Sequence, residues 1–200
     1  MTSYANTIIQ HGTVDIDGVW QRHVPARFRD TALEGRVAPS RWGTGHSFPL
    51  LHLGQPRESV IVEAYRHIVD PVDDPRLATQ IVPRRLVTCS VDVTNIFDLR
   101  SSAGRVAAGL TIETLTSSTE DRDAYAQCRQ AAAVMHQVGL HGLIAPAATR
   151  LGFSLVLFTA NLPDAERPAR RGEDELWDQL PADPRQQARR LNVVADPPTD

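Results

Sequence analysis

Hydrophobic and polar residues alternate along several short stretches of the chain, and this two-residue period predicts β-strands. The alternation runs through residues 19–24 and stops at Pro25, which cannot continue a hydrogen-bonded ladder. The stretch 86–93 is the most strand-like part of the chain, because valine and other strand-favouring residues dominate it. Shorter apolar runs predict three further strands, at residues 50–53, 142–145 and 154–158.

Helical spacing of apolar residues predicts a helix over 56–69, with one stripe formed by Val60, Ala64 and Ile68. Pro56 suits the first turn of this helix, since its missing N–H group would have no partner there. An acidic loop at residues 70–74 follows the helix.

Two more helices are predicted after the strand at 86–93. One begins at Ser101 or Ser102, because serine is a favourable N-cap residue. The other begins at the cap Thr119 and ends at Gly139, which suits the position after a helix. Four residues of this last helix follow helical spacing and are expected in the core: Tyr125, Cys128, Ala132 and Met135.

Short strands interleaved with three helices predict an α+β fold, a single domain with a central mixed or antiparallel sheet and flanking helices. We place the domain at residues 19–162. Residues 1–18 carry brief apolar alternation and are expected to form edge strands or an ordered N-terminal arm.

Residues 163–200 are rich in proline and charge, which predicts a C-terminal tail. A solvated tail is favoured over a lid or a partner contact. A short helix near 173–179 is expected, with Trp177 available for docking, and residues 196–200 are expected to be disordered.

The composition excludes several chemistries. All 21 basic residues are arginine, so the chain has no Schiff-base lysine, no Walker lysine and no Ser-x-x-Lys site. The net charge is −3, and no segment is basic enough to predict a nucleic-acid surface. With two cysteines, no long apolar span and no leader-like start, we expect a cytoplasmic protein without membrane contact.

Arg41 and Glu63 are the strongest candidates for chemistry. Arginine can grip a phosphate through two parallel hydrogen bonds, and glycines such as Gly43 let a backbone approach a ligand closely. Glu63 lies among apolar residues of the predicted helix 56–69, where a carboxylate is costly unless it has a partner. Such a carboxylate could stabilise the positive charge that develops when a glycosyl bond breaks, or it could be a solvated helix residue.

Histidines and one tryptophan accompany this pair. His52 lies between two leucines of a predicted strand, so it is either a core residue or a group that binds a ribose or orients Glu63. His23 has the same two readings, and Trp42 suits either a core position or a pocket wall.

No metal site is expected from the sequence. His136, His141 and Cys128 do not have the spacing of a zinc motif, and Cys128 has no neighbouring base that would make it a nucleophile. No G-x-S-x-G elbow is present for serine catalysis.

Several of these motifs occur in an order that resembles the RES-domain family of bacterial toxins, which destroy NAD⁺ and are paired with antitoxins. The resemblance covers residues 19–160 and rests on Gln21-Arg22-His23, Arg41-Trp42-Gly43, Leu51-His52-Leu53, Glu63 and the turn at 142–148.

This resemblance implies a fold similar to ADP-ribosyltransferase toxins, with NAD⁺ as the substrate in a cleft. It implies that Glu63 faces the nicotinamide ribose and that Arg22 and Arg41 hold phosphates. Water or inorganic phosphate would be the acceptor, so the activity would be that of an NAD⁺ glycohydrolase or phosphorylase without a metal. An antitoxin partner is implied as well, and a homo-oligomer is left open.

The chain departs from the family pattern at four positions. His52 replaces a tyrosine, His23 an aromatic residue and Gly43 an asparagine, while Ala126 stands where some members use a serine. Two further hypotheses therefore stay open. The chain could bind a nucleotide or a protein without catalysis, or it could act on another nucleotide or transfer ADP-ribose to a target.

Overall fold

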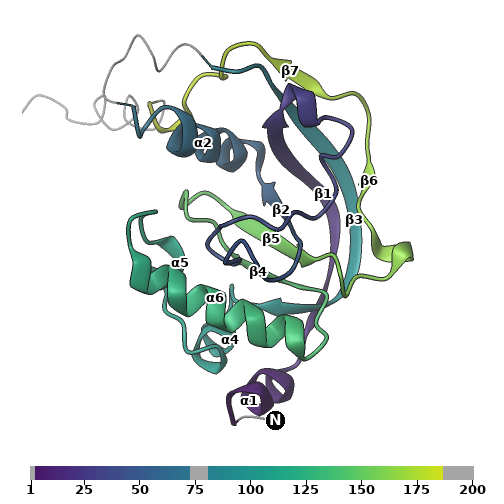
Figure 1. The fold of residues 1–200 in the computed structure, drawn as a ribbon, viewed down its shortest axis with the longest axis vertical. Coiled ribbons are helices and arrows are strands. Elements are labelled where there is room, and N and C mark those ends of the chain that lie inside the picture. Colours follow the sequence, from purple (N-terminus) through teal and green to yellow (C-terminus); the bar gives the residue numbers. More distant parts are fainter. Residues whose placement is uncertain (1–2, 73–80, 187–200) are drawn as a thin grey trace, which may run out of the picture.

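The computed structural model describes residues 3–72 and 81–186 of the 200-residue chain. Its elements in chain order are α1 (Ser3–His11), β1 (Val14–Pro25), η1 (Ala26–Phe28), β2 (Leu50–Gln55), α2 (Arg57–Ile68), β3 (Arg84–Asp98), α4 (Ser102–Ala107), α5 (Ile112–Thr116), α6 (Arg122–Gln137), β4 (Gly142–Pro146), β5 (Phe153–Phe158), η2 (Asp164–Glu166), β6 (Ala169–Arg170) and β7 (Glu175–Trp177). Together they confirm the expected α+β class, with helices around one mixed sheet (Figure 1).

The sheet follows the order β1-β2-β5-β4-β3-β6, with β7 beside β3. β3 pairs antiparallel with β1 from Arg84 to Ile96, and its last three residues pair parallel with β4. Because β1 also pairs with β2, the pairings β1–β2–β5–β4–β3–β1 close a ring. β1 and β3 curve along one side of the molecule in Figure 1, and this curvature brings the ends of the sheet together.

The strand predictions hold because local alternation matches burial. In β3, for example, Cys89, Val91 and Val93 are buried, while Ser90 and Asp92 between them are exposed. Alternate side chains of a strand point to opposite faces, so this pattern fixes which face meets the core. The strands expected at 19–24, 50–53, 142–145 and 154–158 all form; the last three are one or two residues longer than predicted, whereas β1 begins five residues earlier, at Val14, and ends at Pro25.

The helix α2 also forms where the sequence places it, directly after β2. Pro56 is its N-cap residue. Val60 and Ala64 of the predicted stripe are buried in one cluster with Leu86 of β3, and Ile68 packs against this cluster while partly exposed. The expected acidic loop at 70–74 and the disorder expected at 196–200 lie partly or wholly outside the described residues.

The cap of α6 was wrongly placed at Thr119. The side chain of Asp121 accepts the backbone N–H of Ala124, so the helix begins two residues later. Ser101 is the N-cap of α4 as expected, and Gly139 takes a positive φ of 87° after α6 as its C-terminal role requires. The short helix α5 was not predicted from the sequence.

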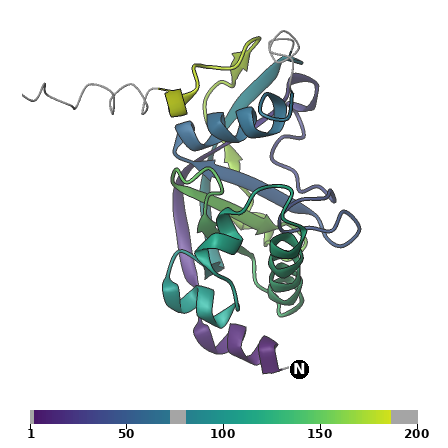
Figure 2. The same cartoon turned by 90° about the vertical axis from the view of Figure 1, so that its left-hand side faces the viewer.

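Edge strands or an ordered arm were expected in residues 1–18: Val14-Asp15-Ile16 does form the start of β1, but the segment before residue 12 forms the helix α1 and no strand. Residues 3–11 are helical because Ala5 and Ile8, one turn apart, are buried on one face of α1. The hydroxyl of Tyr4 donates to the carbonyl of Ala108 beside α4 at 2.8 Å. Figure 2 shows α1 at one end of the molecule, next to α4 and α6, with α2 towards the other end.

The segment after residue 162 continues the sheet, and the helix expected near 173–179 is wrong. Residues 175–177 form β7, which pairs antiparallel with β3 through Arg84↔Trp177. The docking expected for Trp177 is confirmed, since this side chain is only 2% exposed and packs between α2 and β3. Thus residues 163–186 are not a solvated tail.

Candidate functional site

A cavity of about 770 Å³ opens between α2 and α6. Figure 1 shows these helices on the same side of the curved sheet, with β2, β4 and β5 between them. The side chains that line the cavity come from β1, the segment 39–42, β2, α2, the segment 115–129, and the β4–β5 hairpin. Segments from most of the chain therefore meet at one place.

Six of the seven candidate residues line this cavity: Arg22, His23, Arg41, Trp42, His52 and Glu63. Gly43 does not. It is buried in the turn, where its N–H group donates to the hydroxyl of Ser40 at 3.0 Å. A Cβ atom at Gly43 would meet a methyl group of Leu50 at 3.0 Å, so this glycine serves the packing of the turn rather than a ligand.

Glu63 projects from the middle of α2 into the cavity. Its side chain keeps 45% of its exposure, and its Oε1 atom lies 3.8 Å from Nε2 of His67, one turn further along the helix. Burial of the carboxyl raises its pKa, but the contact with His67 and the nearby His23 and His52 outweigh this effect and lower the pKa to about 2. Glu63 is therefore ionised at neutral pH.

Two of the three histidines that line the cavity, His23 and His52, are neutral at the same pH. Burial lowers the pKa of His23 and that of His52 to about 4, against the opposing influence of Glu63. A neutral imidazole has one N–H donor and one acceptor nitrogen. The wall beside Glu63 thus offers hydrogen-bonding groups without additional positive charge.

Arg41 reaches across the cavity rim to the segment between α5 and α6. Its Nη1 atom donates to the carbonyl of Thr114 at 2.8 Å and to the hydroxyl of Ser117 at 2.9 Å, and Nη2 donates to the carbonyl of Ser117 at 2.7 Å. The guanidinium also stacks over the ring of Tyr125 at 4.4 Å. These contacts position its positive charge, and within residues 3–72 and 81–186 no carboxylate pairs with it.

Tyr125 was wrongly assigned to the core stripe of α6. Its ring lines the cavity and lies near two guanidinium groups, those of Arg41 and Arg129. Arg129 in turn donates from Nε to the carbonyl of Ser40 at 2.8 Å, which ties the Arg-Trp-Gly turn to α6. Ala126, by contrast, is exposed and does not line the cavity.

Sequence reasoning missed three arginines of the cavity wall, Arg66, Arg122 and Arg129. With Arg22 and Arg41 they make five cationic side chains, and Glu63 is the only acidic one on the wall as the structure describes it. Helical spacing could have found Arg66, because it follows Glu63 by three residues on α2. Such an excess of arginine favours a ligand with several negative charges.

The turn after β4 forms the floor of the cavity and is held from α2. The hydroxyls of Ser59 and Thr149 lie 2.7 Å apart, and Arg66 donates from Nη1 to the carbonyl of Ala148. Residues 145–149 all line the cavity. The helix that carries Glu63 is therefore fixed to the floor of the cavity at two points.

The described residues contain no cluster of three or more histidine, cysteine, aspartate or glutamate side chains that could hold a metal ion. Cys128 is buried in the core, and burial raises the pKa of its thiol. The side chain of His141 contacts Glu166, with the Nδ1 and Oε2 atoms 2.9 Å apart. No helix within 3–72 and 81–186 is long and apolar enough to cross a bilayer.

Comparison with known proteins defines the class. The RES domain matches residues 18–179, which is most of the chain, so this protein belongs to the RES-domain family. The match extends beyond the boundary at residue 162 and includes β6 and β7. No curated protein sequence matches.

Among solved structures, a chain of the Mycobacterium tuberculosis MbcT–MbcA toxin–antitoxin complex is similar, with a TM-score of 0.71 and 22% sequence identity. The similarity covers 86% of this chain and 91% of that chain. At this identity the comparison supports a common fold.

Proposed function

We propose that this protein is an NAD⁺-degrading enzyme, a glycohydrolase or phosphorylase that breaks the bond between nicotinamide and ribose. The observation that carries the proposal is the position of Glu63, an ionised carboxylate on a wall with five arginines. A ligand that suits this wall has several negative charges at one end and develops positive charge at the other. NAD⁺ has both properties, through its diphosphate and its nicotinamide ribose.

The cavity has the size and polarity for such a ligand. Its volume of about 770 Å³ falls within the range of small-molecule sites. Arg22 lines the cavity from β1, whereas Arg41 and Arg129 line it beside the ring of Tyr125 on α6, so arginines from two parts of the wall are available to a diphosphate.

In the proposed reaction the bond between C1′ of the ribose and the nicotinamide nitrogen breaks, and its electron pair stays on the nicotinamide. The ribose develops oxocarbenium character, which the negative charge of Glu63 stabilises. Water or inorganic phosphate then forms a bond to C1′, and the acceptor's proton is released. The products are nicotinamide with ADP-ribose or its phosphorylated form. His52, neutral at pH 7, is proposed to orient the sugar.

We further propose that this activity is that of a toxin neutralised by an antitoxin protein. Membership in the RES-domain family and the fold shared with a chain of a toxin–antitoxin complex support this role.

The test is NAD⁺ consumption by the purified protein, with and without phosphate, with products identified by mass spectrometry. We expect nicotinamide to appear, and we expect the rate to fall at least about 100-fold in Glu63→Gln, which keeps the shape and loses the charge. Glu58→Gln is the matched control, since Glu58 is exposed on the same helix and does not line the cavity.

Intact NAD⁺ under both conditions would reject the enzymatic proposal and favour a binding protein. A label transferred from NAD⁺ to another macromolecule would instead identify an ADP-ribosyltransferase. Equal rates in Glu63→Gln and the wild type would show that the carboxylate has been assigned the wrong role.

A further inference from the structure

His23 has a hydrogen bond that the proposed reaction leaves unexplained. Its Nδ1 atom accepts from Nε of Arg84 at 2.8 Å. Arg84 lies on β3 and is not part of the cavity lining. His23 is directly opposite Leu86 in the β1–β3 ladder, so Arg84, two residues away, lies diagonally on the same face of the sheet.

This hydrogen bond decides which nitrogen of the ring carries the proton. A guanidinium has five donors and no acceptor, and it stays protonated in proteins. Nδ1 of His23 must therefore present its lone pair to Arg84. The ring is also neutral, because burial lowers the pKa of His23 to about 4, with Arg84, His67 and Arg22 adding to this effect and Glu63 opposing it. The single proton of the neutral ring is then on Nε2.

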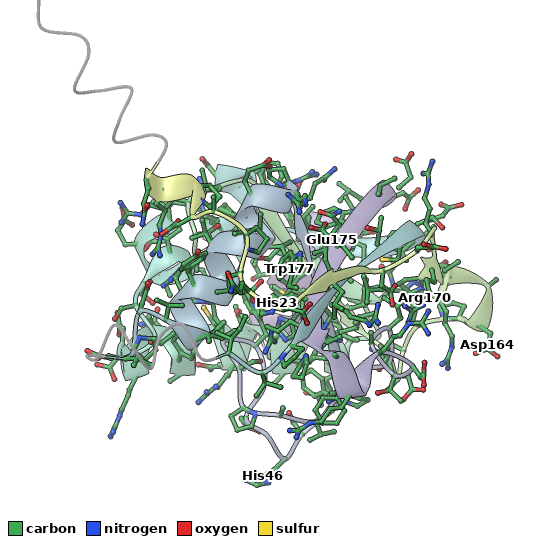
Figure 3. The ribbon with its side chains drawn as sticks, turned by 90° about the horizontal axis from the view of Figure 1, so that it is seen from above. His23, His46, Asp164, Arg170, Glu175 and Trp177 are labelled. Atoms are coloured by element: carbon green, nitrogen blue, oxygen red, sulfur yellow. The ribbon has the colours of Figure 1, made fainter. Side chains whose placement is uncertain are left out.

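The Nε2 atom is available to a ligand. In the part of the chain that the structure describes, no protein group bonds to this atom, and His23 lines the cavity together with Glu63. The indole of Trp177 lies roughly parallel to the His23 ring, with the two centroids 6.3 Å apart and an interplanar angle of 19°. Figure 3 shows these two labelled side chains next to each other.

Trp177 and Arg84 therefore restrain the ring together. Trp177 is 2% exposed and is the register partner of Arg84 in the β3–β7 ladder. The neighbouring indole of Trp177 limits rotation of the imidazole. The guanidinium of Arg84 donates to its Nδ1 atom. The strand β7 does not line the cavity itself, but it helps to fix the orientation of His23, which does.

We propose that Arg84 is a positioning residue, which holds His23 in the neutral Nε2–H tautomer so that the ring presents one N–H donor to the substrate beside Glu63. The proposal rests on the proposed function for the identity of the substrate, but the tautomer is a property of the free protein. A donor on this wall suits a ribose hydroxyl or a phosphate oxygen.

The first test is a nitrogen-15 NMR spectrum of the imidazole groups in the full-length wild type, with His23→Gln to assign the His23 signals. We expect the Nε2–H tautomer in the wild type at neutral pH. In Arg84→Met we expect a mixture of tautomers, and a pKa of His23 that moves up towards the ordinary value of 6.5. Arg84→Lys should keep the wild-type tautomer, because its ammonium group can still donate to Nδ1.

Arg85→Met is the control. Arg85 precedes Leu86 on the same strand but points to the opposite face, so its loss should leave the His23 spectrum unchanged. The Nδ1–H tautomer in the wild type, or unchanged His23 signals in Arg84→Met, would overturn the proposal. The wild-type spectrum decides the first point even if Arg84→Met fails to fold.

The second test is NAD⁺ turnover by the same variants. Loss of a correctly placed donor to a charged or developing-charge group should lower kcat/KM about 10- to 100-fold in Arg84→Met. Arg84→Lys should recover most of this loss, and Arg85→Met should match the wild type. If the tautomer changes in Arg84→Met but turnover does not, the role of Arg84 in the reaction is overturned. If the wild type leaves NAD⁺ intact, the proposed function fails while the spectrum still tests the tautomer.

Discussion

At the scale of single residues, Arg41 illustrates how a candidate for ligand binding also supports the fold around it. The sequence suggested a phosphate grip, whereas the structure adds three hydrogen bonds to Thr114 and Ser117 and a stacking contact with Tyr125. A planar guanidinium can make all of these contacts at once. Its charge can still act on a ligand, because none of these partners neutralises it.

We therefore expect Arg41→Lys to lower both stability and activity. A lysine ammonium cannot reproduce the paired hydrogen bonds or the stacking, so the free energy of unfolding should fall by about 1–3 kcal/mol. Urea unfolding followed by circular dichroism measures this change, and NAD⁺ turnover measures the effect on activity. Arg171→Lys, an exposed site on the connection between β6 and β7, should match the wild type. An unfolding free energy of Arg41→Lys equal to that of the wild type would contradict the structural role.

At the scale of elements, the strand β7 shows how a short segment can fix a functional helix. Trp177 packs with Val60, Ile61 and Ala64 of α2, and Arg57 of the same helix contacts Glu175 at 2.6 Å. Further along, the hydroxyl of Tyr65 donates to the carbonyl of Pro181 at 2.8 Å. The C-terminal segment therefore holds the helix that carries Glu63 against β3.

Trp177→Ala should destabilise the protein by about 3–5 kcal/mol, the usual cost of removing a large buried aromatic side chain. Leu176→Ala, next to it in β7, is the matched control because Leu176 is 47% exposed, and it should change stability by no more than about 0.5 kcal/mol. Chemical denaturation of both variants gives the comparison. Similar losses in the two variants would mean that β7 does not depend on the buried indole.

At the scale of the whole molecule, the charge of the cavity links its chemistry to pH. Five arginines line the cavity with one carboxylate, and two of its histidines, His23 and His52, stay neutral because burial lowers the pKa of each to about 4. An added proton on either histidine increases a positive charge that the cavity already has in excess. The unfolded chain takes up the same protons at the ordinary pKa of 6.5, without this cost.

The contribution of His23 and His52 to the free energy of unfolding should therefore be fully present above pH 6.5. It should be lost as the pH decreases from 6.5 to about 4, because the unfolded state binds more protons in this window. Urea unfolding at a series of pH values measures the slope. His52→Gln removes one of the two groups and should give a shallower slope. His46→Gln, in an exposed loop that Figure 3 shows far from His23, should keep the wild-type slope. A His52→Gln slope as steep as that of the wild type would contradict the prediction.

The sequence alone determined the elements whose signals are local. Alternation specified the strands, and helical spacing together with Pro56 specified α2, because each pattern is set by neighbours within a few residues. The order of the Arg41, His52 and Glu63 motifs also indicated the family, and six of the seven candidate residues meet in one cavity. Their roles in the reaction stay predictions.

The tertiary structure decided everything that depends on distant segments. Residues 175–177 form a strand because β3 offers hydrogen bonds and α2 offers a place for Trp177, although a short helix was expected near 173–179. Arg122 and Arg129 join the site because α6 lies across the cavity from α2. Arg84 reaches His23 because β1 and β3 pair in one particular register. A hydrogen bond or a shared charge depends on distance in space, and a linear pattern contains that distance only when the residues are close along the chain.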